Sequence, residues 1–178
     1  MAYQYKREPL SPEEANRLVN ACDTHQERLV VWTLLDTGLR VSELASLDRK
    51  AIDWQSSPPR IVIHGKGGPY GTRSKRRVVP LAARRSRALL EGHFAVHDTF
   101  GMTVRTIHRI VRRVAQRAGI TRKTSPHVLR HTFSVDSIRK GVSLPALQKV
   151  LGHDHLTTTQ IYLNMSPEDV LREYEDKW

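Results

Sequence analysis

The sequence lacks the marks of secreted and membrane-spanning proteins. Cys22 is the single cysteine in 178 residues, which excludes an internal disulfide framework and a cysteine-based zinc cluster. The N-terminus has no apolar run of the kind a secretory signal needs, and no stretch approaches the roughly 18 apolar residues of a membrane-spanning helix. We therefore expect a cytoplasmic protein that has no contact with a membrane.

Acidic residues are scarce in the middle of the chain. The sequence holds 29 Lys and Arg against 18 Asp and Glu, a net charge of +11. Residues 54–125 contain 16 of the basic residues and only two acidic ones, whereas the flanking segments are nearly neutral. This distribution predicts one positive surface that faces a polyanion, with nucleic acid favoured over a generally basic, solvated surface.

Helical patterns dominate the chain, which predicts one mainly α domain with a small antiparallel β-hairpin. Ser11 and Glu14 form a capping box at the start of the first helix, and Gly38 is suited to end the second. Short strands at 61–63 and 77–81 flank a glycine-rich turn. The expected helices are 11–24, 26–37, one after Arg40, 82–95, 103–118, 126–140, 143–151, 156–163 and 167–176.

Five short motifs carry residues that could perform chemistry. They are T-G-L-R-V-S-E-L at 37–44, G-K-G at 65–67, P-H-V-L-R-H at 126–131, L-G-H at 151–153 and T-T-Q-I-Y at 158–162. Each motif alone is explained by a capped helix, a hairpin tip or a packed side chain. Together they supply two arginines, a lysine, histidines and a tyrosine, without clustered carboxylates.

This set of side chains fits the transfer of a phosphodiester. Negative charge grows on the non-bridging oxygens in the transition state, and two guanidiniums can bind those oxygens in bidentate fashion. A tyrosine can act as the covalent nucleophile, and a lysine can protonate the departing sugar oxygen.

A metal site is the alternative use of the histidines. His127 and His131 have the i,i+4 spacing of metal ligands on a helix, and His153 and His155 could complete a site. However, Val128 occupies the place of the glutamate in H-E-x-x-H, and Arg130 would put a fixed cation beside the metal. We expect no metal ion and no other cofactor.

The order of these motifs resembles the catalytic domain of the tyrosine recombinases, which include the phage integrases and the Xer-type enzymes. The resemblance extends from about residue 9 to residue 174. It implies the DNA breaking-rejoining fold of that family, with residues 1–178 forming one catalytic domain. The family usually has an N-terminal core-binding domain that closes over DNA. This sequence departs from that pattern, and we expect the domain to be absent from this chain because the first expected helix begins about ten residues from Met1.

The resemblance assigns a role to each motif residue. Arg40 and Arg130 match the two catalytic arginines, and Tyr162 matches the nucleophile that forms a 3′-phosphotyrosyl bond. Lys66 matches the general acid on the hairpin, with Lys75 as second choice because the turn is long. The remaining matches are His127 in acid/base chemistry, His153 at the scissile phosphate, and Glu43 and His131 as bracing positions.

The implied function is site-specific recombination of double-stranded DNA, without metal or ATP. We expect a homo-tetramer on paired DNA sites, associated with the nucleoid. A type IB topoisomerase and a non-catalytic DNA-binding factor are the alternatives. The basic residues expected to contact DNA are Arg73, Lys75, Arg76, Arg77, Arg109, Arg112 and Arg113.

Overall fold

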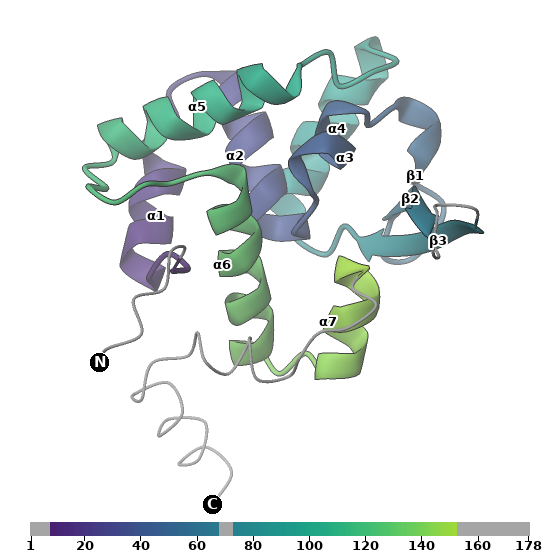
Figure 1. The fold of residues 1–178 in the computed structure, drawn as a ribbon. Helices are drawn as coiled ribbons and strands as arrows, with labels where there is room; N and C mark the ends of the chain where they lie inside the picture. The colour runs from purple at the N-terminus through teal and green to yellow at the C-terminus, as the bar shows by residue number, and fades with distance from the viewer. Residues whose placement is uncertain (1–7, 68–72, 153–178) are drawn as a thin grey trace, which may run out of the picture.

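A computed structural model describes residues 8–67 and 73–152 as a helical domain with a small sheet at one side (Figure 1). The elements are α1 Pro12–Asn20, α2 His25–Thr37, α3 Val41–Ala45, a 3-10 turn Arg49–Ala51, β1 Ile52–Asp53, β2 Arg60–Gly67, β3 Arg73–Pro80, α4 Arg84–Val96, α5 Val104–Arg117, α6 Pro126–Arg139 and α7 Leu144–Leu151. The prediction of a mainly helical domain with a small antiparallel sheet is confirmed. The helices expected at 156–163 and 167–176 lie outside the described residues.

Capping side chains define the first two helices. The Ser11 hydroxyl accepts a hydrogen bond from the Glu14 amide at the start of α1, and the Glu14 carboxylate accepts one from the Ser11 amide. A second capping box, formed by Thr24 and Glu27, starts α2 at His25. Thr24 is extended because it is the N-cap residue of α2, so α1 cannot continue to residue 24 as predicted. Helix α1 ends at Asn20.

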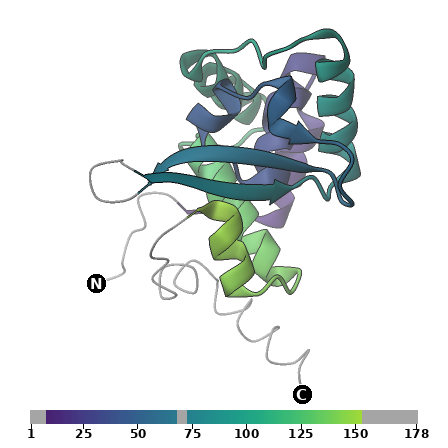
Figure 2. The same ribbon diagram turned by 90° about the vertical axis from the view of Figure 1, so that its right-hand side faces the viewer.

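The sheet has three antiparallel strands in the order β1–β2–β3. The ladder between β2 and β3 runs from Arg60 opposite Pro80 to Gly67 opposite Arg73, so both strands are longer than predicted. The sequence did not indicate β1, because two residues are too few to show an alternating pattern. Helix α7 packs against β3, as Figure 2 shows for α7 and the hairpin.

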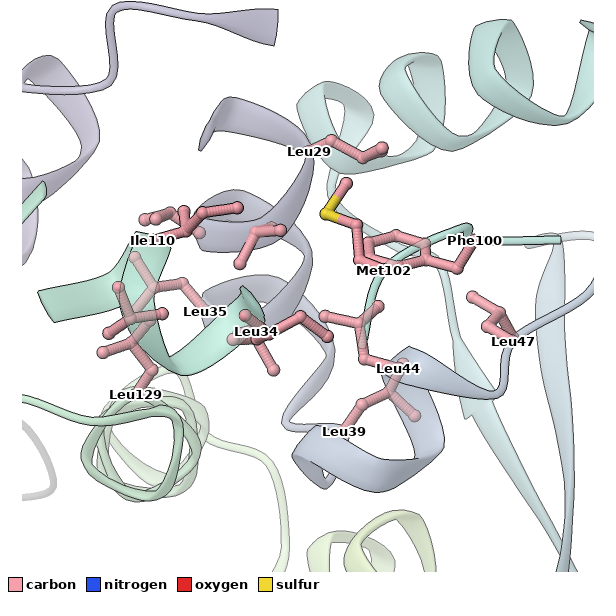
Figure 3. Close-up of a cluster of buried hydrophobic side chains, with 14 of the residues drawn as sticks. Leu29, Leu34, Leu35, Leu39, Leu44, Leu47, Phe100, Met102, Ile110 and Leu129 are labelled. Carbon is pink, nitrogen blue, oxygen red and sulfur yellow. The ribbon is translucent and has the colours of Figure 1, made fainter. Parts of the chain in front are cut away.

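Helix α2 is the centre of the core, where it contacts α1, α4, α5 and α6. Leu34 and Leu35 of α2 lie among side chains from other elements, including Leu44 of α3, Ile110 of α5 and Leu129 of α6 (Figure 3). This packing holds the two ends of α2 at fixed places in the domain. Within the described ranges no helix is long and apolar enough to cross a membrane.

A buried carboxylate joins α2 to α5. Glu27 is 1% exposed, and its carboxylate accepts hydrogen bonds from Arg113 Nε at 3.0 Å and from the Arg117 guanidinium. The backbone amides of Asp23 and Thr24 donate to the same carboxylate. Burial alone would raise the pKa of Glu27, but the hydrogen bonds from Arg117, the two amides and Arg113 outweigh burial and lower the pKa to about 2.

We predict that Glu27 stabilises the fold in a pH-dependent way. The pKa in the folded state lies below the usual 4.5, so the stabilisation is complete above about pH 4.5 and is lost as the pH falls toward 2. Glu27→Gln should lower the free energy of unfolding by about 3 kcal/mol at pH 7, because two arginines lose a buried partner. Urea denaturation should show this deficit shrinking by more than half at pH 3.

The matched control is Glu91→Gln on the exposed surface of α4, which should change stability little at either pH. A Glu27→Gln deficit of equal size at pH 7 and pH 3 would contradict the assignment.

Candidate active site

The turn between α2 and α3 positions Arg40. Helix α2 ends at Thr37, Gly38 follows it in the left-handed conformation with φ of 61°, and Arg40 is the N-cap residue of α3. The Glu43 carboxylate accepts hydrogen bonds from the Arg40 backbone amide at 2.7 Å and from Arg40 Nη1 at 3.0 Å. A sequence that places Glu three residues after Arg therefore holds that arginine in place locally.

Arg130 of α6 donates hydrogen bonds to backbone carbonyl oxygens at the C-terminal ends of two other helices. Its Nη1 donates to the Gly38 carbonyl oxygen after α2, and its Nη2 donates to the Leu151 carbonyl oxygen at the end of α7 at 2.7 Å. Carbonyls at helix C-termini have no partner within their helix and carry partial negative charge, so they suit a buried cation. Burial, followed by the charge of Arg40, lowers the pKa of Arg130 to about 10, which still leaves it protonated at neutral pH.

Arg40 and Arg130 meet at the end of α7. Arg40 Nη2 donates to the Gly152 carbonyl oxygen at 3.2 Å, one residue beyond the carbonyl that Arg130 binds. The two predicted catalytic arginines are thus brought together by consecutive carbonyls. The predicted site residues His153 and Tyr162 lie outside the described residues.

Arg77, which the sequence suggested as a DNA contact, lies in the interior instead. It is 9% exposed, and its Nη2 lies 2.6 Å from Glu43 Oε2. The physical reason is the alternation of side chains along β3, which exposes Arg76 and Val78 and buries Arg77 and Val79. Burial lowers the pKa of Arg77, partly offset by the charge of Glu43.

The two candidate hairpin lysines lie on neighbouring rungs of the ladder. Lys66 of β2 pairs with Ser74, and Lys75 of β3 pairs with Gly65. The described part of the structure covers the backbone of both lysines but not their side chains. The choice of Lys66 over Lys75 therefore stays a prediction.

The two histidines of α6 share one face, as their spacing predicted. The ring centroids of His127 and His131 are 5.9 Å apart. His127 is exposed in the first turn of the helix, whereas His131 is half-buried beside it. Burial lowers the pKa of His131, and the nearby charges of His127 and Arg130 lower it further. His131 is therefore neutral at neutral pH and suited to a bracing role.

The basic residues of α5 divide between two faces of the helix. Arg109 and Arg112 are exposed and line a groove of about 750 Å³ beside residues 120–125. Arg113 pairs with Glu27 while 52% of its side chain stays exposed, so its contact with DNA stays a prediction. Arg105, His108 and Lys123 also line this groove, and the sequence reasoning missed them. The spacing of Arg105 and His108 with Arg109 and Arg112 on one face of α5 could have indicated the first two.

We predict that the turn at Gly38 requires glycine for two separable reasons. A Cβ on Gly38 would lie 2.3 Å from Phe133 Cδ1, in addition to the strain of a positive φ. Gly141 has φ of 81° but nothing within 4 Å of its Cβ position, so it reports the strain alone. Urea denaturation should show a loss of about 1–2 kcal/mol for Gly141→Ala and about 2–5 kcal/mol for Gly38→Ala. Equal losses in the two variants would show that the Phe133 contact relaxes freely.

Comparison with known proteins connects this geometry to a family. The sequence matches the phage integrase family over residues 8–169. It is 34% identical to the tyrosine recombinase XerA of Saccharolobus solfataricus, over 90% of this chain and 53% of the relative. It is 33% identical to the tyrosine recombinase XerC of Listeria innocua, over 85% of this chain and 53% of the relative. The chain thus spans about half the length of these curated relatives.

Solved structures show the same fold. The crystal structure of XerA recombinase superposes with a TM-score of 0.79 at 30% identity, covering 96% of this chain and 65% of that one. The XerH recombinase, solved as a post-cleavage complex with its palindromic difH substrate, gives a TM-score of 0.76 at 23% identity, covering 96% of this chain and 53% of that one. From this fold and these sequence matches we conclude that the chain belongs to the phage integrase family and carries the catalytic-domain fold of the tyrosine recombinases.

Proposed function

We propose that this chain breaks and rejoins double-stranded DNA as a site-specific tyrosine recombinase. The observation that carries the proposal is the meeting of Arg40 and Arg130 at consecutive carbonyls of α7. Residues from distant parts of the sequence thereby form one doubly charged site. Membership of the phage integrase family supports the same reaction.

The two guanidiniums would stabilise the charge that grows on the scissile phosphate. The Arg40 side chain is 45% exposed, so an anion can reach it, whereas Arg130 is 7% exposed. Their proximity is unfavourable without an anion, since the charge of Arg40 contributes to the lowered pKa of Arg130. A phosphate between them would relieve that repulsion, most strongly in the transition state.

The covalent steps use residues assigned through the family resemblance. Tyr162 attacks the phosphorus, a 3′-phosphotyrosyl bond forms, and the bond from phosphorus to the 5′ oxygen breaks. A hairpin lysine, Lys66, protonates that oxygen, and His127 and His153 assist at the phosphate. A 5′ hydroxyl of the partner duplex then attacks the adduct and releases Tyr162. One phosphodiester replaces another, so the reaction needs no ATP.

Strand exchange between two duplexes also suggests how many copies of the chain act together. The XerH structure contains a palindromic substrate, and a palindrome offers two equivalent half-sites. One copy of this chain on each half-site of two paired duplexes makes a homo-tetramer. Such an assembly would act on chromosomal or mobile-element DNA within the nucleoid.

We predict that Tyr162→Phe abolishes the covalent adduct while DNA binding survives, because one hydroxyl is lost and the ring remains. The measurement is a denaturing gel of the protein with a nicked duplex carrying candidate sites, where wild type should give a slower, protease-sensitive band. Fluorescence anisotropy serves as the binding control. An undiminished adduct in Tyr162→Phe would mean that another residue is the nucleophile.

We predict that the lysine acting as general acid becomes dispensable when the leaving group needs no proton. Lys66→Ala should cleave an ordinary duplex slowly and a duplex with a bridging 5′ sulfur at nearly the wild-type rate, because a thiolate departs unprotonated. Lys75→Ala is the matched variant on the neighbouring rung. Rescue of Lys75→Ala alone would reassign the role to Lys75, and rescue of neither would remove both lysines from the mechanism.

A further inference from the structure

Arg77 is held by a carboxylate that also holds an arginine of the candidate active site. Arg77 Nη2 lies 2.6 Å from Glu43 Oε2, and the two side chains are only 8% and 13% exposed. The same carboxylate accepts hydrogen bonds from the backbone amide and from Nη1 of Arg40. One buried carboxylate therefore links β3 to the backbone and the guanidinium of Arg40.

Arg77 also packs beneath the end of α7, where Arg40 binds. A Cβ on Gly152 would lie 2.5 Å from Arg77 Cδ, so the side chain passes directly against this glycine. The Gly152 carbonyl is the acceptor for Arg40 Nη2. Arg77 thus contacts both of the groups that hold the Arg40 guanidinium, Glu43 and Gly152.

The hydrogen bonding of the Arg77 guanidinium is directed to Glu43. Its Nε and Nη1 are buried and have no hydrogen-bond partner among the described residues. Buried donors without partners are costly, and an apolar side chain of similar length would avoid that cost. Among the described residues, the side-chain partner of this guanidinium is Glu43, so the charge of Arg77 acts on the carboxylate that also holds Arg40.

The charges of Arg40, Glu43 and Arg77 indicate what Arg77 contributes to the candidate site. With Arg77 present, Glu43 divides its negative charge between two guanidiniums, and the group of three has a net charge of +1. Without Arg77, Glu43 would neutralise Arg40 alone, and the net charge would be zero. The carboxylate would also lose the contact that fixes it from the side of the sheet.

We propose that Arg77 is a positioning residue for Arg40: it anchors Glu43 and shares its charge, so that Arg40 meets the phosphate in place and with its own charge available. This inference rests on the proposed function and extends it to a residue that does not touch DNA.

The test compares Arg77→Met and Arg77→Lys with the double variant Arg77→Met/Glu43→Gln. The matched control is Arg60→Met, which removes an arginine that pairs with Asp53 in the same sheet. Each protein is assayed for the single-turnover rate of adduct formation on the nicked duplex and for DNA affinity against salt by anisotropy. Thermal unfolding checks that each variant is folded.

We expect Arg77→Met to slow adduct formation by about tenfold or more, since small displacements of a positioned group cost this much or more. DNA affinity should stay within about twofold of wild type, and the salt dependence should not change. Arg77→Lys, which retains the charge, should be intermediate, and it carries the test if Arg77→Met is unfolded. Arg60→Met should cleave at the wild-type rate.

The double variant separates positioning from mere stability. Because Glu43→Gln restores the net charge of +1, the double variant should react faster than Arg77→Met, whereas a structural role predicts a further loss. A double variant no faster than Arg77→Met would overturn the proposal, as would an unchanged rate in Arg77→Met. A salt slope reduced by about 0.9 in Arg77→Met would instead make Arg77 a phosphate contact.

A second readout decides the inference without cleavage. If wild type forms no adduct, the proposed function fails. The effect of Arg77 on Arg40 through Glu43 can still be tested by the rate at which phenylglyoxal modifies Arg40, mapped by mass spectrometry. Arg77→Met should slow this reaction, because Glu43 would then pair with Arg40 alone and hold its guanidinium more tightly, and Glu43→Gln should reverse the effect. Arg85, held by Asp36, is the internal control. Equal Arg40 rates in all variants would overturn the inference.

Discussion

The arrangement of the site depends on the hydrogen bonds that the Arg130 guanidinium donates to the ends of two helices. It lies where α2 and α7 both end, and it donates hydrogen bonds to the carbonyl oxygens of Gly38 and Leu151. Both helix C-termini carry partial negative charge, so they would repel each other without the cation that both of them bind. The same cation is a predicted catalytic group, so the side chain that joins the helices is also half of the proposed phosphate site.

Concentrating arginines in one place raises an electrostatic problem, and a single carboxylate reduces it. Glu43 contacts both Arg40 and Arg77, while Arg130 is compensated by backbone carbonyls. The site therefore remains positively charged but is held from α3, α6 and β3 at once. Such preorganised charge suits a reaction whose transition state is more anionic than its substrate, because little reorganisation is needed when that charge appears.

Local patterns predicted much of the fold and the grouping of the motifs. The capping box at Ser11 and the glycine after α2 lie where the sequence placed them, since caps depend on a few neighbouring residues. The family and its helical fold followed from the order of five motifs. The sequence did not predict the length of the hairpin or the strand β1. Both are defined by pairing with a partner strand, and a short segment carries little sequence signal of that pairing.

The sequence by itself determined which residue types are available and which family the chain belongs to, because motif order and helical spacing are properties of the chain. Only the tertiary structure decided what each basic residue faces. Arg76 and Arg77 are adjacent and look alike in sequence, yet one is exposed and the other is buried against Glu43. Arg112 and Arg113 are both exposed, but only Arg113 pairs with Glu27 of α2 among the residues that the structure describes. The partner that separates each pair lies in a distant segment, and packing alone brings it there.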